Sequence, residues 1–247
     1  VFMSTPFSIA AIELLEKINI PVWKVGSGEV GFEPMIAAMI KTKKPIIVST
    51  GLSDMSVTDK LCISLKENKI NFAILNCKTA YPSQLEDVGL NMLEIYKQKY
   101  LCPVGLSDHT GTVNPAIAAI ALGAAVIEVH VVFDKDMFGP DTKASLTEKE
   151  LKSVTDFRNA FDIMQNNPMD KKNLSKLDYK NKNLFGRSIA LRDNLEKGDV
   201  ILPENILWKK PSGGISPSDI DKILYKKTSQ AVQSNRLLQW SDIENQD

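Results

Sequence analysis

Short apolar runs alternate with segments whose apolar residues recur at helical spacing in the N-terminal part of the chain. The short runs are FMS, PVWKV, PIIVS, FAILN, PVGLS and AVIEVHVVF, and they are rich in β-branched residues. The segments between them include IAAIELLEKI, EPMIAAMIKT, VTDKLCISLKEN and NPAIAAIALGA. An interval of about 20 to 30 residues between strands accommodates one strand and a crossover helix. The pattern therefore predicts an α/β fold with a parallel sheet.

The number of strands leaves the architecture open. Six runs of strand type are visible, whereas the most common closed barrel built from β/α units has eight strands. An open, doubly wound sheet accommodates six strands without closing. The hydrophobic periodicity alone therefore does not choose between a barrel and an open sheet.

The pattern changes after the last of these runs. Thr147 and Glu150 have the spacing of a capping box, which predicts a long helix from there through about residue 164. The next segment is rich in Asn and Lys, which predicts a linker, and beyond it short apolar stretches are punctuated by Gly and Pro. We therefore expect a β/α domain at 1–164, a linker at 165–183 and a small domain of mainly irregular and β structure at 184–247.

Composition and charge narrow the classes of function. Hydrophobic residues make up 43% of the chain and charged residues 24%, as in globular proteins, and no segment is expected to span a membrane. Thirty basic and thirty acidic residues give a net charge of +0, so we expect no nucleic-acid partner. The three cysteines lack CxxC spacing and are expected to be buried small hydrophobes in a cytoplasmic protein.

Polar residues recur directly after the apolar runs. Ligands of parallel β/α folds bind at the carboxyl ends of the strands, so these positions are the candidates for a site. Hydroxyls, lysines and the amides near Gly26, Gly28 and Gly51 suit an anion such as phosphate. For any single hydroxyl, a strand-end turn or a helix cap is an equal explanation, and the hypothesis depends on their recurrence. The strand-end set is Ser4, Thr5, Lys24, Ser27, Glu29, Ser49, Thr50, Lys78, Thr79, Tyr81, Ser107, Asp108, His109, Glu128 and His130.

The only two histidines of the chain, His109 and His130, lie at the ends of successive predicted strands. A lone histidine is more often structural, but neighbouring strands are about 4.8 Å apart, so two imidazoles can converge on one divalent ion. Asp108 or Glu128 would add a carboxylate or orient a ring. Glu128 and His130 are two residues apart and share one face of the strand. With only two imidazoles, such a site keeps positions open, as catalytic metal sites do.

Several of these motifs together resemble one family. FMSTPFS, WKVGSGE, IIVSTGL, GLSDHT, IEVHVVF and GPDTKASL are similar, in order and spacing, to motifs of the N-acetylneuraminate (sialic acid) synthase family. The segment GRSIALRDNLEKGDVILPENILWKKPSGGISP resembles the C-terminal antifreeze-like or SAF domain of that family. The resemblance implies a (β/α)8 TIM barrel that lacks its first two β/α units in this chain, followed by a small SAF domain of β-clip type.

The resemblance also implies a reaction. Phosphoenolpyruvate would condense with N-acetylmannosamine, in its open-chain aldehyde form, to a nonulosonic acid, and phosphate would leave by C–O cleavage. Legionaminic and pseudaminic acid synthases share these motifs but use a 2,4-diacetamido hexose, and the sequence leaves that choice open. A non-catalytic carbohydrate-binding or ice-binding protein is the alternative from another class.

Site residues follow from the match to the family's motifs. His109 and His130 would bind Mn²⁺ or Mg²⁺, the divalent metal of the family. Phosphoenolpyruvate would be held by Thr5, Lys24, Ser27, Thr79 and Ser107, and the sugar by Phe7, Tyr81, Asp141 and Lys210. Glu128, Glu29 and Asp108 are the candidate catalytic residues.

Some features depart from the family's pattern. Lys210 stands where the family usually has arginine, whose planar fork differs from an ammonium group, and Lys78 and Thr79 replace neutral residues. Family members form dimers with swapped domains, so we expect a homodimer in which Lys210 reaches the partner's site.

The chain opens with VFMST, which has the character of a strand rather than a leader, so we expect a fragment. Unpaired edges are an aggregation hazard, so we expect the chain alone to be inactive and poorly soluble.

Overall fold

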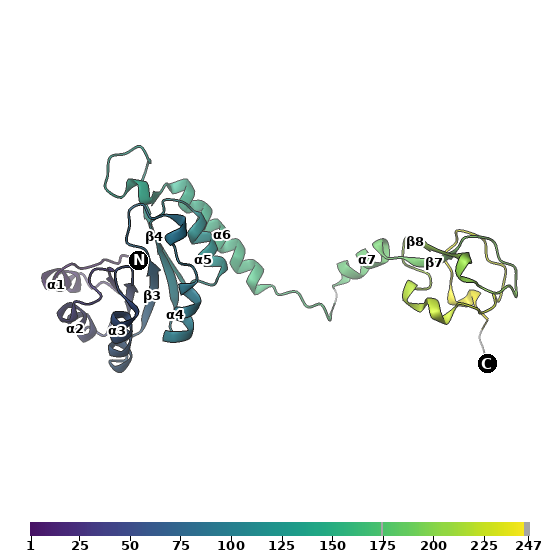
Figure 1. Cartoon of the computed structure of the whole chain (residues 1–247), viewed down its shortest axis with the longest axis horizontal. Coiled ribbons are helices and arrows are strands. Elements are labelled where there is room, and N and C mark those ends of the chain that lie inside the picture. Colours follow the sequence, from purple (N-terminus) through teal and green to yellow (C-terminus); the bar gives the residue numbers. More distant parts are fainter. Residues whose placement is uncertain (174, 245–247) are drawn as a thin grey trace. The chain divides into compact units, whose positions relative to one another are not determined.

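The computed structural model describes residues 1–173 and 175–244 and divides into two compact units, Val1–Asn167 and Pro168–Asp247 (Figure 1). Each unit has its own hydrophobic core. Among the described helices, none has a segment long and apolar enough to cross a membrane.

The first unit is built on a six-stranded sheet in which consecutive strands are neighbours and run parallel. Its strands are β1 (Trp23–Val25), β2 (Ile46–Ser49), β3 (Phe72–Cys77), β4 (Val104–Asp108), β5 (Val126–Val131) and β6 (Ser145–Leu146). Its helices are α1 (Ile9–Lys17), α2 (Glu33–Lys41), α3 (Met55–Glu67), α4 (Met92–Tyr100), α5 (Asn114–Ala121) and α6 (Glu148–Asn166). This is the predicted α/β alternation.

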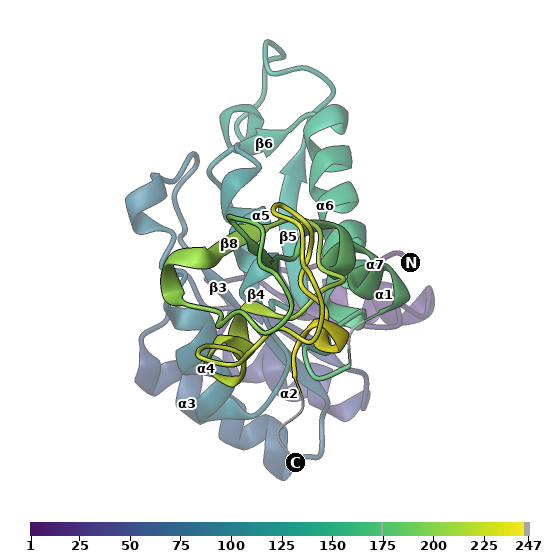
Figure 2. The ribbon, with the colours of Figure 1, turned by 90° about the vertical axis from the view of Figure 1, so that its right-hand side faces the viewer.

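Helices pack on the sheet through the apolar residues of the predicted pattern. α4 contacts β3 and β4, α5 contacts β4 and β5, and α6 lies beside α5 (Figure 2). Trp23 and Ile46 on the strands are fully buried, as are Met35 and Met39 on α2. Burying a side chain of this size stabilises a fold by about 1.5 to 3 kcal/mol, so this shared core holds the strand ends in place.

The sheet is curled, and one ion pair shows it. Nζ of Lys24 on β1 lies 3.4 Å from Oε2 of Glu128 on β5. These strands are four positions apart in the sheet, and four steps in a flat sheet would separate them by about 19 Å. Two side chains do not span that distance, so the strands must bend around a concave face that carries Lys24 and Glu128.

The first and last strands differ from the prediction. The FMS run, predicted as a strand, forms only a single parallel bridge, Ser4 with Trp23, and its residues Val1, Phe2 and Met3 are exposed. This segment pairs on one side only, with β1, so nothing holds it as a full strand. The sixth strand is instead β6, two residues long, which pairs with the end of β5. So short a strand carries no detectable periodicity.

The long helix α6 begins as predicted. The hydroxyl of Thr147 accepts a hydrogen bond from the amide of Glu150 at 3.4 Å, and Oε2 of Glu150 accepts one from the amide of Thr147 at 2.7 Å. This capping box satisfies two amides that the first helical turn leaves without partners. The prediction of a helix beginning at this motif is confirmed, and the helix ends at Asn166.

The second unit contains α7 (Lys176–Phe185) and an antiparallel pair, β7 (Ser188–Leu191) and β8 (Ile206–Lys209). Short turns and isolated bridges connect the rest around a core that includes Ile189 and Leu238. α7 lies mostly within the segment predicted as a linker. It is helical because Ser175 and Asp178 form a second capping box.

Candidate active site

A cavity of about 550 Å³ opens at the carboxyl ends of the strands in the first unit. Polar side chains gather there because each strand ends at this edge of the sheet. The cavity is lined by ten of the predicted site residues, Thr5, Phe7, Lys24, Ser27, Tyr81, Ser107, His109, Glu128, His130 and Asp141. Met3, Ser4, Gly26, Ser49 and Cys77 complete the lining.

Four strands, β1, β2, β4 and β5, contribute to a charged network on the concave face. Nζ of Lys24 donates a hydrogen bond to Oγ of Ser49 at 2.8 Å and pairs with Oε2 of Glu128. Oγ of Ser107 donates to Oε1 of Glu128 at 2.7 Å. The ammonium and the two hydroxyls are donors of the kind that bind phosphate and carboxylate groups.

Two loops meet beside this network. The hydroxyls of Ser27 and Thr79 are 2.8 Å apart, so Thr79 reaches the site through Ser27 although it does not line the cavity. A Cβ atom at Gly51 would lie 2.2 Å from Oγ1 of Thr79. Only glycine allows the loop after β2 to approach the loop after β3 so closely.

The two imidazoles converge at the ends of β4 and β5. Their ring centroids are 5.1 Å apart and their planes are nearly perpendicular, at 85°. Nδ1 of His109 lies 2.8 Å from the carbonyl oxygen of Lys78, and Nδ1 of His130 lies 3.2 Å from Oδ2 of Asp141. Both partners are acceptors, so we assign the proton of each neutral ring to Nδ1, which leaves Nε2 free as a ligand.

These residues fit a divalent metal ion. Imidazole nitrogens oriented by a carbonyl or a carboxylate on the opposite ring atom are the usual arrangement of metal-binding histidines. Within residues 1–173 and 175–244, no group of three or more His, Cys, Asp and Glu side chains is arranged to hold a metal ion by itself. An ion bound here would therefore keep coordination positions for water or substrate, as in catalytic sites.

Tyr81 covers the imidazoles. Its ring centroid lies 4.2 Å from that of His109 and 5.6 Å from that of His130. Burial, together with nearby Cys77, Asp141 and Glu128, raises the pKa of Tyr81, so its hydroxyl stays protonated at neutral pH. The phenol is thus a neutral donor at the mouth of the cavity.

Burial also affects the titration of the groups at the end of β4. Burial lowers the pKa of His109, but the acceptors Cys77 and the carbonyl of Lys78 outweigh it, and the net shift is upward. Burial raises the pKa of Asp108. Asp108 does not face the cavity, because its carboxylate accepts hydrogen bonds from the amide and hydroxyl of Thr110 at 3.1 and 3.0 Å. Its contacts are those of a residue that closes the turn after β4.

Two other predicted site residues lie outside the cavity lining. Glu29 sits in the turn after β1, where its amide donates to the carbonyl of Gly26 at 3.0 Å. Lys210 belongs to the second unit, where its Nζ lies 5.7 Å from the ring centroid of Phe185. Its role in sugar binding stays a prediction.

Ser49 and Cys77 contact predicted site residues, yet sequence reasoning gave neither of them an individual role. Ser49 belongs to the strand-end set and binds Lys24. Cys77 was expected to be a buried small hydrophobe, yet it lines the cavity with its sulfur 4.0 Å from Nδ1 of His109. Its position as the last residue of β3 is the signal that could have identified it.

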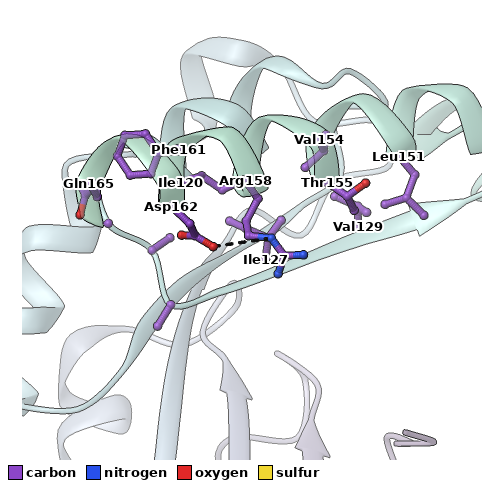
Figure 3. A pocket seen from close by; sticks show the side chains of 13 residues that line it. Ile120, Ile127, Val129, Leu151, Val154, Thr155, Arg158, Phe161, Asp162 and Gln165 are labelled. Carbon is purple, nitrogen blue, oxygen red and sulfur yellow. Dashed lines mark ion pairs between the residues drawn. The ribbon is translucent and has the colours of Figure 1, made fainter. Parts of the chain in front are cut away.

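A second cavity, of about 540 Å³, lies between α6 and the opposite face of β5 (Figure 3). Ile127 and Val129 face it, whereas Glu128 and His130 line the first cavity, as the two-residue period of a strand requires. Its charged side chains are Arg158 and Asp162, which form an ion pair at 4.0 Å. The polar groups that suit an anionic ligand therefore converge only at the first of these two cavities.

Comparison with known proteins gives matches to both parts of the chain. Residues 1–168 match the NeuB family and residues 186–244 match the SAF domain. The chain is 33% identical to an N,N'-diacetyllegionaminic acid synthase of Campylobacter jejuni, over 96% of the chain and 71% of that protein. It is 34% identical to a pseudaminic acid synthase of the same species, over 97% of the chain and 69% of that protein.

A solved structure extends the likeness to the fold. The crystal structure of an N-acetylneuraminic acid (sialic acid) synthetase from Leptospira borgpetersenii, in complex with citrate, is similar with a TM-score of 0.66. The identity is 25%, and the match covers 72% of this chain and 63% of that one.

Proposed function

The chain belongs to the NeuB family and ends in a SAF domain, and from this premise we propose that it is a nonulosonic acid synthase. It condenses phosphoenolpyruvate with the open-chain aldehyde of an N-acylated amino sugar. The observation that supports this most strongly is the single cavity where a lysine, several hydroxyls, a glutamate and two imidazoles converge. The curated relatives named as synthases of such acids support the reaction class.

Phosphoenolpyruvate is the anionic substrate in this proposal. Lys24 supplies positive charge, and Thr5, Ser27 and Ser107 supply hydroxyl donors along the same rim. Thr79 holds the hydroxyl of Ser27 in position. Charge-assisted hydrogen bonds of this kind fix the orientation of phosphate and carboxylate groups.

His109 and His130 are the proposed ligands of Mn²⁺ or Mg²⁺. Their Nε2 atoms would hold such an ion, which would supply Lewis acidity toward the aldehyde oxygen. Tyr81, Phe7 and Asp141 lie at the same mouth and are proposed to orient the sugar. The hydrogen bonds of both Nδ1 atoms keep the imidazoles ready as ligands.

Glu128 is the proposed proton acceptor. A new bond forms between carbon 3 of phosphoenolpyruvate and the aldehyde carbon, which leaves the aldehyde oxygen as an alkoxide, and water adds to carbon 2 while one of its protons passes to Glu128. The bond between carbon 2 and the bridging oxygen then breaks, the remaining hydroxyl of carbon 2 gives its proton to the departing phosphate and becomes the carbonyl, and Glu128 returns its proton to the alkoxide. Lys24 and Ser107 hold the Glu128 carboxylate in the cavity during these steps.

The amino sugar has two candidates. N-Acetylmannosamine is the first, since it gives sialic acid itself. A 2,4-diacetamido hexose is the second, and it is favoured by the relatives named as diacetyllegionaminic and pseudaminic acid synthases. Lys210 would contact the N-acyl group from a second copy of the chain in a domain-swapped homodimer.

We also propose that the curled sheet is part of an eight-stranded β/α barrel. The support is physical: the first-strand segment is paired on one side only, and among the described strands Val126–Val129 of β5 pair with β4 alone, since β6 pairs only with His130 and Val131. The first-strand segment and β1 to β5 make six strands, with β6 a short addition at the end of β5, so two further strands between these edges would complete an eight-stranded ring.

The test of the reaction uses the 247-residue chain and the longest gene product that contains it. Each is incubated with phosphoenolpyruvate, Mn²⁺ and either N-acetylmannosamine or a 2,4-diacetamido hexose, and phosphate release and product mass are measured. We expect the longer gene product to turn over one of the two sugars. The values of kcat/KM for the two sugars identify which one is the preferred substrate. Absence of turnover with both sugars would favour a carbohydrate-binding protein, and full turnover by the 247-residue chain alone would contradict the barrel proposal.

A further inference from the structure

The carboxylate of Asp141 lines the cavity and also contacts the imidazole of His130. Its Oδ2 lies 3.2 Å from Nδ1 of the imidazole. An ionised carboxylate only accepts hydrogen bonds, so the ring must donate through Nδ1–H. That choice leaves the lone pair of Nε2 on the opposite side of the ring.

Asp141 is itself held by the residues at the start of β6, the strand that pairs with His130. The carbonyl oxygen of Asp141 accepts hydrogen bonds from the hydroxyl of Ser145 at 2.8 Å and from the amide of Ala144 at 2.9 Å. Ser145 is the residue of β6 directly paired with His130 in the sheet. The chain thus forms a closed ring of contacts from His130 through Ser145 to Asp141 and back.

The neighbouring histidine is oriented differently. Nδ1 of His109 meets the backbone carbonyl of Lys78, and only 3% of His109 is exposed. The side chain of His130 is 31% exposed, so packing alone restrains it less. The orientation of His130 therefore depends more on a single side chain, which a substitution can remove.

We propose that Asp141 is a positioning residue that sets the tautomer and direction of His130 and thereby the affinity of the site for a divalent ion. This inference deepens the proposed function and rests on it for the identity of the ion. It differs from a sugar contact, because its effect appears before any substrate is bound.

The first test needs no metal and no activity. The chain has only two histidines, so ¹⁵N-labelled histidine gives two resolvable imidazoles, and long-range ¹H–¹⁵N spectra in mildly alkaline solution report the tautomer of each. We expect both rings of the wild-type chain to be Nδ1–H. In Asp141→Ala, His130 should shift toward Nε2–H while His109 stays unchanged and serves as the internal folding control.

Two further variants sharpen this test. Asp141→Asn retains an acceptor oxygen and should give an intermediate shift at His130. Asp136→Ala removes an exposed carboxylate from the same loop and should change neither ring. Unchanged His130 resonances in a folded Asp141→Ala chain would overturn the proposal, whatever the result of the activity assay.

The second test measures the dissociation constant of Mn²⁺ without phosphoenolpyruvate or sugar, from the electron paramagnetic resonance of the free ion. Loss of the group that orients a metal-binding histidine typically weakens affinity by about 10- to 100-fold. We expect a change of that size in Asp141→Ala and none in Asp136→Ala. A residue that only contacts the sugar would leave Mn²⁺ affinity unchanged and raise KM for the sugar, and that result would contradict the positioning role.

Discussion

Glu128 in the first unit and Asp242 in the second have similar partners but different surroundings. Glu128 binds Lys24 and Ser107, and 34% of its side chain is exposed to the cavity. Asp242 accepts hydrogen bonds from Nη2 of Arg236 at 2.8 Å, from Nε2 of Gln230 at 2.6 Å and from the amide of Gln239 at 2.8 Å, and only 1% of its side chain is exposed.

The difference separates a chemical role from a structural one. Asp242 is enclosed by donors, so no substrate has room to approach it, and its removal would leave those donors without a partner. Glu128 has fewer protein partners and faces a space where a substrate fits. A charged side chain with partners is therefore not by itself a sign of catalysis, and the adjoining cavity is what distinguishes Glu128.

Glu128→Gln should produce the largest effect. If Glu128 accepts a proton in the reaction, kcat/KM of the longest gene product that contains the chain should fall by about 10² to 10⁴-fold. The amide is nearly isosteric, so the free energy of unfolding should change by less than about 1 kcal/mol. Activity assays and thermal melting measure the two quantities, with the exposed Glu67→Gln as the control. Equal activity of Glu128→Gln and Glu67→Gln would show that Glu128 takes no part in the reaction.

Asp242→Asn should show the opposite profile. Losing the charge that binds three donors should destabilise the second unit by about 2 kcal/mol, while Mn²⁺ affinity of the first unit stays unchanged. Calorimetry resolves the unfolding transition, and Asp221→Asn removes an exposed carboxylate of the same unit for comparison. If both variants melt like the wild-type chain, the Asp242 network has no stabilising role.

Gly51→Ala should have an intermediate effect confined to the anion side of the cavity. The new Cβ would lie 2.2 Å from Oγ1 of Thr79 and would displace it from Ser27. In the longest gene product that contains the chain, we expect KM for phosphoenolpyruvate to rise by about tenfold, a cost of about 1.4 kcal/mol. Gly31→Ala is the matched control, since its Cβ would meet no atom nearer than 3.9 Å. An unchanged KM for phosphoenolpyruvate in Gly51→Ala would show that phosphate binding does not depend on the contact between Ser27 and Thr79.

The smallest effect is a pH dependence of the second unit. Burial raises the pKa of Asp242, but the hydrogen bonds from Arg236, Gln239 and Gln230 outweigh it and hold the pKa below its ordinary value. This stabilisation is therefore present above the unfolded-state pKa of about 3.9 and is lost as the pH falls through the lower folded-state pKa. The melting difference between the wild-type chain and Asp242→Asn should narrow below about pH 4. A difference that is constant from pH 7 to pH 3 would contradict this origin.

Much of the fold was predictable because it depends on local patterns. The β/α alternation comes from apolar periodicity, and the start of α6 comes from the spacing of Thr147 and Glu150. The two-residue β6 was not predictable, because its pairing with His130 depends on the path of the preceding loop. The weak pairing of the FMS segment was also missed, because a strand's neighbours are not visible in its own sequence.

The candidate site was predictable as a set but not in every role. The carboxyl ends of parallel strands converge by topology, so His109 and His130 were expected to meet. Asp108 follows the same rule, yet its side chain turns to Thr110, because a local hydrogen bond competes with the cavity. Strand-end position fixes where a residue lies, whereas rotamer and local partners decide where it points.

The binding of Mn²⁺ to the wild-type chain, His109→Ala and His130→Ala tests the central claim most directly. The free ion is titrated in the absence of substrates and followed by electron paramagnetic resonance, and thermal melting checks that each variant folds. If the paired imidazoles form the metal site, each substitution should weaken binding by at least about 100-fold, more than loss of an orienting partner typically costs. Equal Mn²⁺ affinity in all three folded proteins would contradict a metal site at the ends of β4 and β5.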